Sequence, residues 1–206
     1  MIVAKRWMVV VGVGLALAWS PGLRAQGVGL QVADTANVRT AGDTEFTAGM
    51  VKAQHMTGTA VRGALSVQDN FRVFADLGWA EPDSGRGNLA VQAGGIYALD
   101  VDFLSDLGVR VAGYYVDTDT VNLMGGNLML LSSGELLLEG MFLYGGLGID
   151  LADHTTALSL TESSDHTELN PAATIGVLYM FTPHISAYVE ASHIDGPMIG
   201  FGVRYR

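Results

Sequence analysis

The 206-residue sequence contains no cysteine, which excludes disulfide bridges, thiolate metal sites and a lipid anchor on an N-terminal cysteine. Basic residues are also scarce, with 11 Lys and Arg against 21 Asp and Glu, for a formal net charge of −10. Because phosphate backbones attract basic surfaces, this acidic balance argues against a nucleic-acid partner.

Long apolar runs are missing after the first 25 residues, so we expect no helix of the roughly 20 residues needed to span a bilayer. Yet 49% of the residues are hydrophobic and the mean hydropathy is +0.31. Strands that are apolar on one side only reconcile these two facts.

Residues 1–25 have the pattern of a secretory signal peptide: Lys5 and Arg6 precede an apolar stretch over 7–19, and Ala25 offers a small residue for cleavage. We expect its removal, followed by a polar N-terminal lead-in over 26–44 on the periplasmic side and a barrel domain over 45–206. Cleavage also removes Arg24, which leaves 11 − 3 = 8 basic residues and a net charge of 8 − 21 = −13.

Residues 185–205 show the clearest periodicity. Ile185, Ala187, Val189 and Ala191 alternate with polar residues, and Ile199, Phe201, Val203 and Tyr205 alternate with Gly200, Gly202 and Arg204 after a turn. Period two over consecutive runs predicts a strand hairpin, and a polar face carrying glycines and charges is typical of a crowded lumen. The apolar face is then expected to meet lipid.

The same reasoning predicts ten strands in an all-β antiparallel transmembrane barrel, with eight strands as the alternative and a soluble β-sandwich as the competing fold. The predicted ranges are 46–53, 57–67, 71–80, 89–99, 107–116, 121–131, 136–149, 171–181, 185–192 and 198–205. We expect short turns on the periplasmic side and longer loops outside, the longest being 150–170. Strands one, six and seven have no firm register, since Lys52 and Glu139 fall on the lipid face and Gly125 with Gly126 resembles a bulge.

Aromatic residues on the apolar face cluster at strand ends, as expected for two girdles at the membrane interfaces. Trp79 and Tyr115 are predicted at the outer rim. The inner rim is assigned Phe71, Tyr97, Tyr179, Phe181 and Tyr205.

Charged residues on the polar face are expected to form a network that plugs the lumen, comprising Arg62, Arg72, Asp76, Arg110, Glu190 and Arg204. A three-residue loop 68–70 would pair Val67 with Phe71 and therefore Arg62 with Asp76 directly across the hairpin. A five-residue loop sets Tyr188 opposite Gly202 and Ser186 opposite Arg204. A narrow pore is the functional alternative to a plug.

Two enzymatic alternatives have some support in the sequence. The predicted acidic loop 150–170 carries two Asp-His pairs among its acidic and histidine residues, which are Asp150, Asp153, His154, Glu162, Asp165, His166 and Glu168. In strand count and in acidic residues with a histidine near the outer rim, the chain is similar to the omptin proteases. Ser192 and His193 with Glu190 resemble the barrel lipid A deacylases, but the order differs and His193 alternates to the other face. We predict no catalytic site, no metal site and no cofactor.

Three segments resemble the small outer-membrane β-barrel superfamily of porin-like and adhesin-like proteins: VQDNFRVFADLGW at 67–79, LYGGLGI at 143–149 and GFGVRYR at 200–206. One departure is Arg206, which follows the terminal aromatic Tyr205. The resemblance implies a monomer in the outer membrane, in contact with lipid, lipopolysaccharide and the barrel insertion machinery. The predicted role is non-enzymatic, structural or in surface interaction, with a narrow solute channel second and a hydrolase third.

Overall fold

The computed structural model describes residues 34–38, 40–54, 56–83, 86–100, 106–117, 121–136, 138–157, 163–194 and 196–206, with the side chains of 88, 121, 154–157 and 163–166 left aside. The predicted signal peptide, the lead-in before residue 34, His55 and Glu162 lie outside this description. In the described part no helix is long and apolar enough to cross a membrane.

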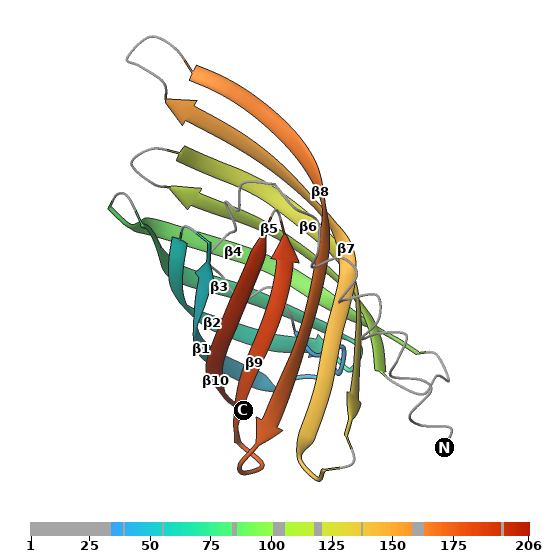
Figure 1. Ribbon diagram of the computed structural model, residues 1–206. Helices are drawn as coiled ribbons and strands as arrows, with labels where there is room; N and C mark the ends of the chain where they lie inside the picture. The colour runs from blue at the N-terminus through green and yellow to red at the C-terminus, as the bar shows by residue number, and fades with distance from the viewer. Residues whose placement is uncertain are drawn as a thin grey trace, which may run out of the picture.

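Ten antiparallel strands close into one barrel in the order β1-β10-β9-β8-β7-β6-β5-β4-β3-β2, which confirms ten strands over eight (Figure 1). The strands are β1 Thr44–Ala53, β2 Met56–Gln68, β3 Phe71–Pro82, β4 Asn88–Leu99, β5 Asp106–Asp117, β6 Val121–Glu135, β7 Met141–Ala157, β8 Ser163–Met180, β9 Ile185–Ile194 and β10 Pro197–Tyr205. Closure between β1 and β10 leaves no open edge around the barrel wall.

The two ends of the barrel differ in what they carry. We call the turn end the one where β2–β3, β4–β5, β6–β7 and β8–β9 connect, and where β1 begins and β10 ends. The loop end is the opposite one, and there β7 and β8 rise beyond the other strands as a long hairpin (Figure 1).

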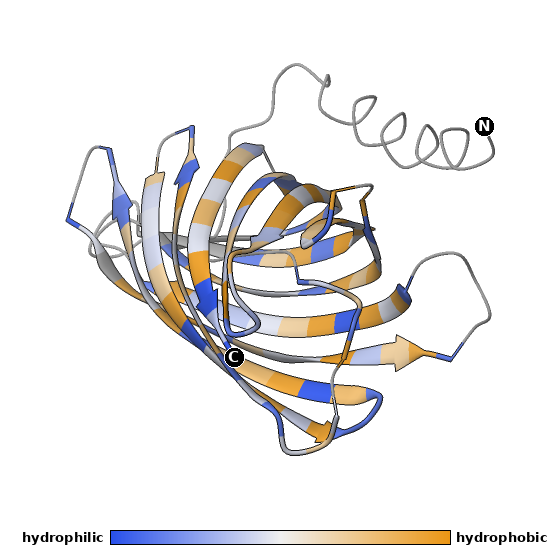
Figure 2. Cartoon of the chain, turned by 90° about the horizontal axis from the view of Figure 1, so that it is seen from below, coloured by the Kyte–Doolittle hydropathy of each residue, from blue (hydrophilic) through white to orange (hydrophobic). Residues whose placement is uncertain are grey.

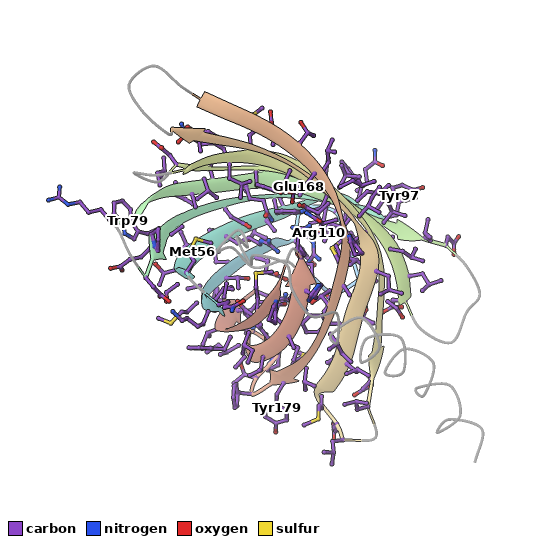
Figure 3. The ribbon with its side chains drawn as sticks, turned by 45° about the horizontal axis from the view of Figure 1, so that its top comes forward. Met56, Trp79, Tyr97, Arg110, Glu168 and Tyr179 are labelled. Atoms are coloured by element: carbon purple, nitrogen blue, oxygen red, sulfur yellow. The ribbon has the colours of Figure 1, made fainter. Side chains whose placement is uncertain are left out.

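Burial alternates along the strands with period two, as β5 and β9 show over their full lengths. The predicted apolar faces point outward and the predicted polar faces point inward, so the molecule is inside-out relative to a soluble protein. Hydrophobic and hydrophilic residues accordingly alternate along single strands in Figure 2. Figure 3 shows Arg110 within the barrel while Trp79 and Tyr179 project from its outer surface.

The predicted boundary between the sixth and seventh strands is wrong. β6 continues through 132–135, which was expected to be a turn, and β7 starts only at Met141. Glu139 therefore lies in the turn and is exposed, next to Gly140, whose φ of 76° suits glycine. This removes the problem of a glutamate facing lipid.

The predicted long loop 150–170 is wrong as well, because most of it is strand. β7 and β8 pair from Met141 with Tyr179 up to Ala157 with Ser163, so only 158–162 connects them. Connections are short at both ends of the barrel, and the expected contrast in loop length is replaced by a contrast in strand length. Polar residues outnumber apolar ones in this stretch, and for that reason its pattern resembles a loop.

Two other local predictions are resolved. Gly125 and Gly126 form no bulge, since β5 and β6 pair without a register shift from Asp106 to Asp117. Lys52 does face outward, but it lies at the loop end, where its Nζ reaches Asp83 Oδ1 at 2.8 Å. A long cationic side chain at a strand end keeps its charge near water.

One strand segment lacks a second neighbour. β8 pairs with β9 only from Ala172 onward, while its pairing with β7 extends back to Ser163. Residues 163–171 therefore have one edge without a strand partner in the described part of the chain. Pro171 stands at the end of this open edge, and proline removes a backbone donor where pairing stops.

The interior changes character along the barrel axis. Toward its loop end every strand contributes at least one buried apolar residue, and we call the following ten the apolar collar: Ala53, Met56, Ala80, Ala90, Val116, Leu123, Ala152, Ala172, Ile194 and Met198. Met56 is labelled within the barrel in Figure 3. The polar lumen expected from sequence is thus confined to the middle and the turn-end half.

Candidate functional site: the charged interior

The six residues expected in the lumen lie inside the barrel and are buried. They are Arg62 on β2, Arg72 and Asp76 on β3, Arg110 on β5, Glu190 on β9 and Arg204 on β10. The seven aromatic residues assigned to the girdles lie on the outer face, with Phe71 half-buried and the others exposed. Tyr179 and Phe181 contact each other edge to face, with ring centroids 5.0 Å apart.

Arg62 and Asp76 are direct cross-strand partners, as the parity of the hairpin predicts. Arg62 donates from Nε to Asp76 Oδ1 at 2.6 Å and from Nη2 to Oδ2 at 2.7 Å, forming a forked ion pair. The predicted pairing of Val67 with Phe71 is wrong, because a register shift after Ser66 sets Gln68 opposite Phe71. The shift lies beyond Arg62, so it leaves the ion pair intact.

Asp34 is the centre of the network, and sequence analysis missed it. Its carboxylate accepts hydrogen bonds from Arg62 Nη1 at 2.8 Å, Arg72 Nη2 at 3.1 Å and Arg204 Nη2 at 3.2 Å. Asp34, Thr35 and Ala36 are buried, so this part of the lead-in lies in the lumen rather than outside the barrel on the periplasmic side. No periodicity marks residue 34; the only signal was the excess of lumen arginines over assigned carboxylates.

The charge of Asp34 depends on its three partners. Burial by itself raises the pKa of the Asp34 carboxyl, but the positive charges of Arg72, Arg62 and Arg204 outweigh burial and hold that pKa well below its usual range. The carboxyl therefore stays ionised at neutral pH. A buried carboxylate without such partners would cost several kcal/mol.

Glu45, at the start of β1, is a second anionic centre nearer the turn end. Its carboxylate lies 3.1 Å from Arg204 Nε, 3.4 Å from Arg72 Nη1 and 2.7 Å from Arg206 Nε. The residue that departs from the usual terminal aromatic, Arg206, is thus engaged with the first strand. Because the register of β1 was not resolved from sequence, Glu45 was not assigned to the lumen.

Arg110 is fully buried and held differently from the other arginines. It hydrogen-bonds through Nη1 to Asn127 Oδ1, and its guanidinium lies 5.0 Å from the centre of the Phe74 ring. Arg62 lies 4.3 Å from the centre of the same ring, so one phenyl ring serves two cations. Nε and Nη2 of Arg110 have no hydrogen-bond partner in the described structure.

Three inward tyrosines lie over glycines of adjacent strands. Tyr188 faces Gly202 in the predicted register, and the pairs Tyr114 with Gly125 and Tyr144 with Gly176 repeat this arrangement. A Cβ at any of these glycines would collide with the facing tyrosine. The glycines therefore admit rings into a narrow interior, as in other sheets where an aromatic covers a glycine.

The hydroxyls of these rings extend the polar network. Tyr144 donates to Glu190 Oε2 at 3.1 Å, and Tyr114 donates to Asp150 Oδ2 at 2.8 Å. Asp150, which was assigned to the acidic loop, is therefore buried in the lumen. Beside Arg62, Asp76 and Tyr188 a cavity of about 10 Å³ remains, room for about one water molecule.

A wider cavity of about 280 Å³ opens at the turn end. It is lined by the beginning of β1 and by Ser66, Arg72, His184 and Arg206, with Glu45 on its wall. This cavity leads from the turn end directly to the arginines that hold Asp34 and Glu45.

Among the residues of the enzymatic alternatives, the register of β7 and β8 sets His154 opposite His166, whereas Ser192 and His193 lie on opposite faces of β9. Ser192 points into the barrel, where its Oγ lies 3.1 Å from Thr174 Oγ1, whereas His193 is half-buried on the other face. Asp153 accepts a hydrogen bond from Thr167 at 3.5 Å. Among the described residues no group of His, Asp and Glu has the arrangement of a metal site.

No protein-family model matches the sequence, and no curated protein is similar to it. Solved structures with a similar shape are transmembrane barrels. The N-terminal β-barrel domain of OprF from Pseudomonas aeruginosa is 15% identical, over 81% of this chain and 98% of that one, with a TM-score of 0.37. The KdgM porin is 8% identical over 79% and 98%, with a TM-score of 0.44. The translocator domain of NalP from Neisseria meningitidis is 13% identical over 100% and 95%, with a TM-score of 0.48.

Proposed function

Because its apolar exterior and charged interior make this chain a small outer-membrane β-barrel, we propose that it has a non-enzymatic, structural or surface-interaction role. In this proposal it is a monomer whose lumen is closed by charged side chains. Its partners are outer-membrane lipid and lipopolysaccharide, and the barrel insertion machinery places it there.

The belt of outward side chains supports the membrane setting. Val61, Leu77, Val111, Phe201 and Val203 all face outward with more than half of their surface exposed. Such an exterior is unfavourable in water but matches the hydrocarbon core of a bilayer. The outward aromatic residues near the strand ends then fall at the two interfaces.

The interior supports a closed lumen. The Asp34 and Glu45 centres tie β1, β2, β3 and β10 together across the middle of the barrel, and the apolar collar lies between them and the loop end. Water and ions crossing the lumen would then meet a cluster of ion pairs and a ring of buried apolar side chains, which supports a closed lumen.

The long β7–β8 hairpin supports a surface role. With the turn end in the periplasm, as the usual topology of such barrels requires, this hairpin projects to the outside. Its free edge at 163–171 offers unpaired backbone groups, and an extended segment of a partner protein would bind there by adding a strand.

The closed lumen is tested with purified, refolded protein in liposomes and planar bilayers. We expect heat-modifiable mobility on gels, which reports a folded barrel, together with no swelling of liposomes in small sugars and no large stable conductance. A large stable conductance of the unmodified protein would contradict the closed lumen and favour the second candidate, a narrow porin-like channel. The cavity of about 280 Å³ at the turn end is the observation that supports this candidate.

A further inference from the structure

We propose that the arginines Arg62, Arg72 and Arg204 form an oxyanion-binding site that Asp34 occupies as an internal, exchangeable ligand. Free carboxylates or phosphates that enter from the turn end would compete with Asp34 for this site. The proposal rests on the closed lumen proposed above, and it adds a ligand class and a means of opening.

The geometry of Asp34 is that of a bound ligand. Its two carboxylate oxygens meet three guanidinium groups from β2, β3 and β10 at 2.8 to 3.2 Å. The residue belongs to none of the strands, so the arginines are fixed by the barrel wall while the carboxylate is supplied by the segment before it. The planar guanidinium fork matches the oxygens of both carboxylates and phosphates.

Besides this carboxylate, the described N-terminal segment is held by other contacts: Ala36 is fully buried, Ala41 N donates to Asp69 Oδ1 at 2.9 Å, and Gly42 N donates to Ser66 O at 2.7 Å. Thr35 O accepts a bond from Arg72 Nη2 at 3.2 Å, and Asn37 Nδ2 reaches Asp106 Oδ2 at 3.1 Å in an exposed position. Ala36 packs beside Gly108 of β5, which leaves room for it. Asp34 is the only charged residue in 34–38 and 40–42, so an anion can replace its carboxylate on the arginines while the bonds at Ala41 and Gly42 keep the segment attached to the barrel.

The arginine cluster also has unused donors. Nε of Arg72, Nη1 of Arg204 and both Nε and Nη2 of Arg110 are buried with no hydrogen-bond partner in the described structure. Leaving such donors unpaired is costly, and an oxyanion with three or four acceptor oxygens would satisfy more of them than the carboxylate of Asp34 does.

Removal of Asp34 changes the charge balance of the lumen. Around its position the barrel wall presents Arg62, Arg72, Arg110 and Arg204, against the carboxylates of Asp76 and Glu45. With Asp34 in place the charges of this group sum to 4 − 3 = +1, and without it they sum to 4 − 2 = +2. A narrow passage lined in this way favours anions over cations.

The route to the site is already present. The cavity of about 280 Å³ at the turn end is lined by Arg72, Arg206 and Glu45. Of these, Arg72 contacts Asp34 and Arg206 contacts Glu45. An anion entering there meets Arg206 and Arg72 before it reaches Asp34.

The test compares the full mature chain with Asp34→Asn, Asp34→Glu and the matched control Asp43→Asn. Asp43 lies in the same segment and lines the turn-end cavity, but it is exposed and forms no ion pair with the lumen arginines in the described structure. Heat-modifiable gel mobility checks folding, and conductance and reversal potential are measured in planar bilayers under a potassium chloride gradient. We expect Asp34→Asn to conduct several-fold more than the unmodified protein, with a reversal potential shifted toward that of chloride. Asp34→Glu and Asp43→Asn should stay closed.

Inorganic phosphate is the probe for the binding site itself. We expect it to raise the thermal transition of Asp34→Asn but not that of Asp43→Asn, since a ligand stabilises the state to which it binds. A closed or cation-selective Asp34→Asn barrel, or one indifferent to phosphate, would overturn the proposal. Failure of Asp34→Asn to fold while Asp43→Asn folds would also overturn it, because the segment would then be part of the framework. Conductance of the unmodified protein, in contrast, would count against the closed lumen alone.

Discussion

At the scale of single residues, the Arg62–Asp76 pair was predictable and Asp34 was not. The pair follows from parity: two alternating strands joined by a short turn must place facing residues at a constant sum of residue numbers, and only the polar members have chemistry to share. Asp34 lies outside any repeating pattern, so its position is decided by the shape of the closed lumen. Glu45 was missed for a related reason, because β1 has no clear register in the sequence.

The Arg62–Asp76 pair should be strongly coupled. We expect Arg62→Met and Asp76→Asn each to lower the free energy of unfolding by about 2 to 4 kcal/mol, since each leaves a buried charge without its fork partner. The double variant should lose clearly less than the sum of the two. Urea unfolding of refolded protein in lipid measures all three, and strict additivity would mean that the two side chains do not act as a pair.

The tyrosine-over-glycine arrangement provides a second test at this scale. A Cβ at Gly176 would collide with the ring of Tyr144, whereas one at Gly63, on the outer face, would have nothing closer than Phe46 Cε1 at 4.0 Å. We expect Gly176→Ala to cost about 1 to 3 kcal/mol through overpacking, and Gly63→Ala to be nearly neutral. Equal losses in thermal unfolding would show that the ring does not need the glycine.

At the scale of elements, strands with strong apolar alternation were predicted within a few residues, and the β7–β8 hairpin was not. Polar residues predominate in the sequence of its upper part, so there is no apolar alternation from which a period could be read. Pairing of the two strands with each other forms it instead. The apolar collar was missed because alanine marks neither a polar nor a strongly apolar face.

The tip of this hairpin should be dispensable for folding. Thr156 and Ser164 are cross-strand partners, so replacing residues 157–163 with an Asn-Gly turn joins them by a two-residue loop. We expect the shortened chain to keep heat-modifiable mobility and a free energy of unfolding within about 0.5 kcal/mol of the original. A chain that no longer folds would show that the tip directs assembly.

At the scale of the whole molecule, the sequence established the ten-strand closed barrel and its inside-out surface, because both follow from alternation repeated ten times. It did not establish that the segment before β1 lies in the lumen. That arrangement depends on the combined charge of β2, β3 and β10, which no single stretch of sequence reveals.

Acid should weaken the whole assembly through Asp34. Because its pKa in the folded barrel lies below that of an unfolded aspartate, its contribution to stability is fully present above about pH 4 and is lost as pH falls below that value. We expect the difference in thermal transition between the unmodified protein and Asp34→Asn to be constant from about pH 5 to 8 and to shrink in stronger acid. A difference that changes between pH 5 and 8 would assign the effect to another group.

The contact between Asp34 and Arg204 joins the earliest described part of the chain to the final strand. Once the barrel has closed, the segment that carries Asp34 can enter the lumen only through one of the two open ends. In the simplest order of assembly, residues 34–36 therefore already lie against β2 and β3 when β10 pairs with β1. The last strand pairing to form would then enclose these residues in the lumen.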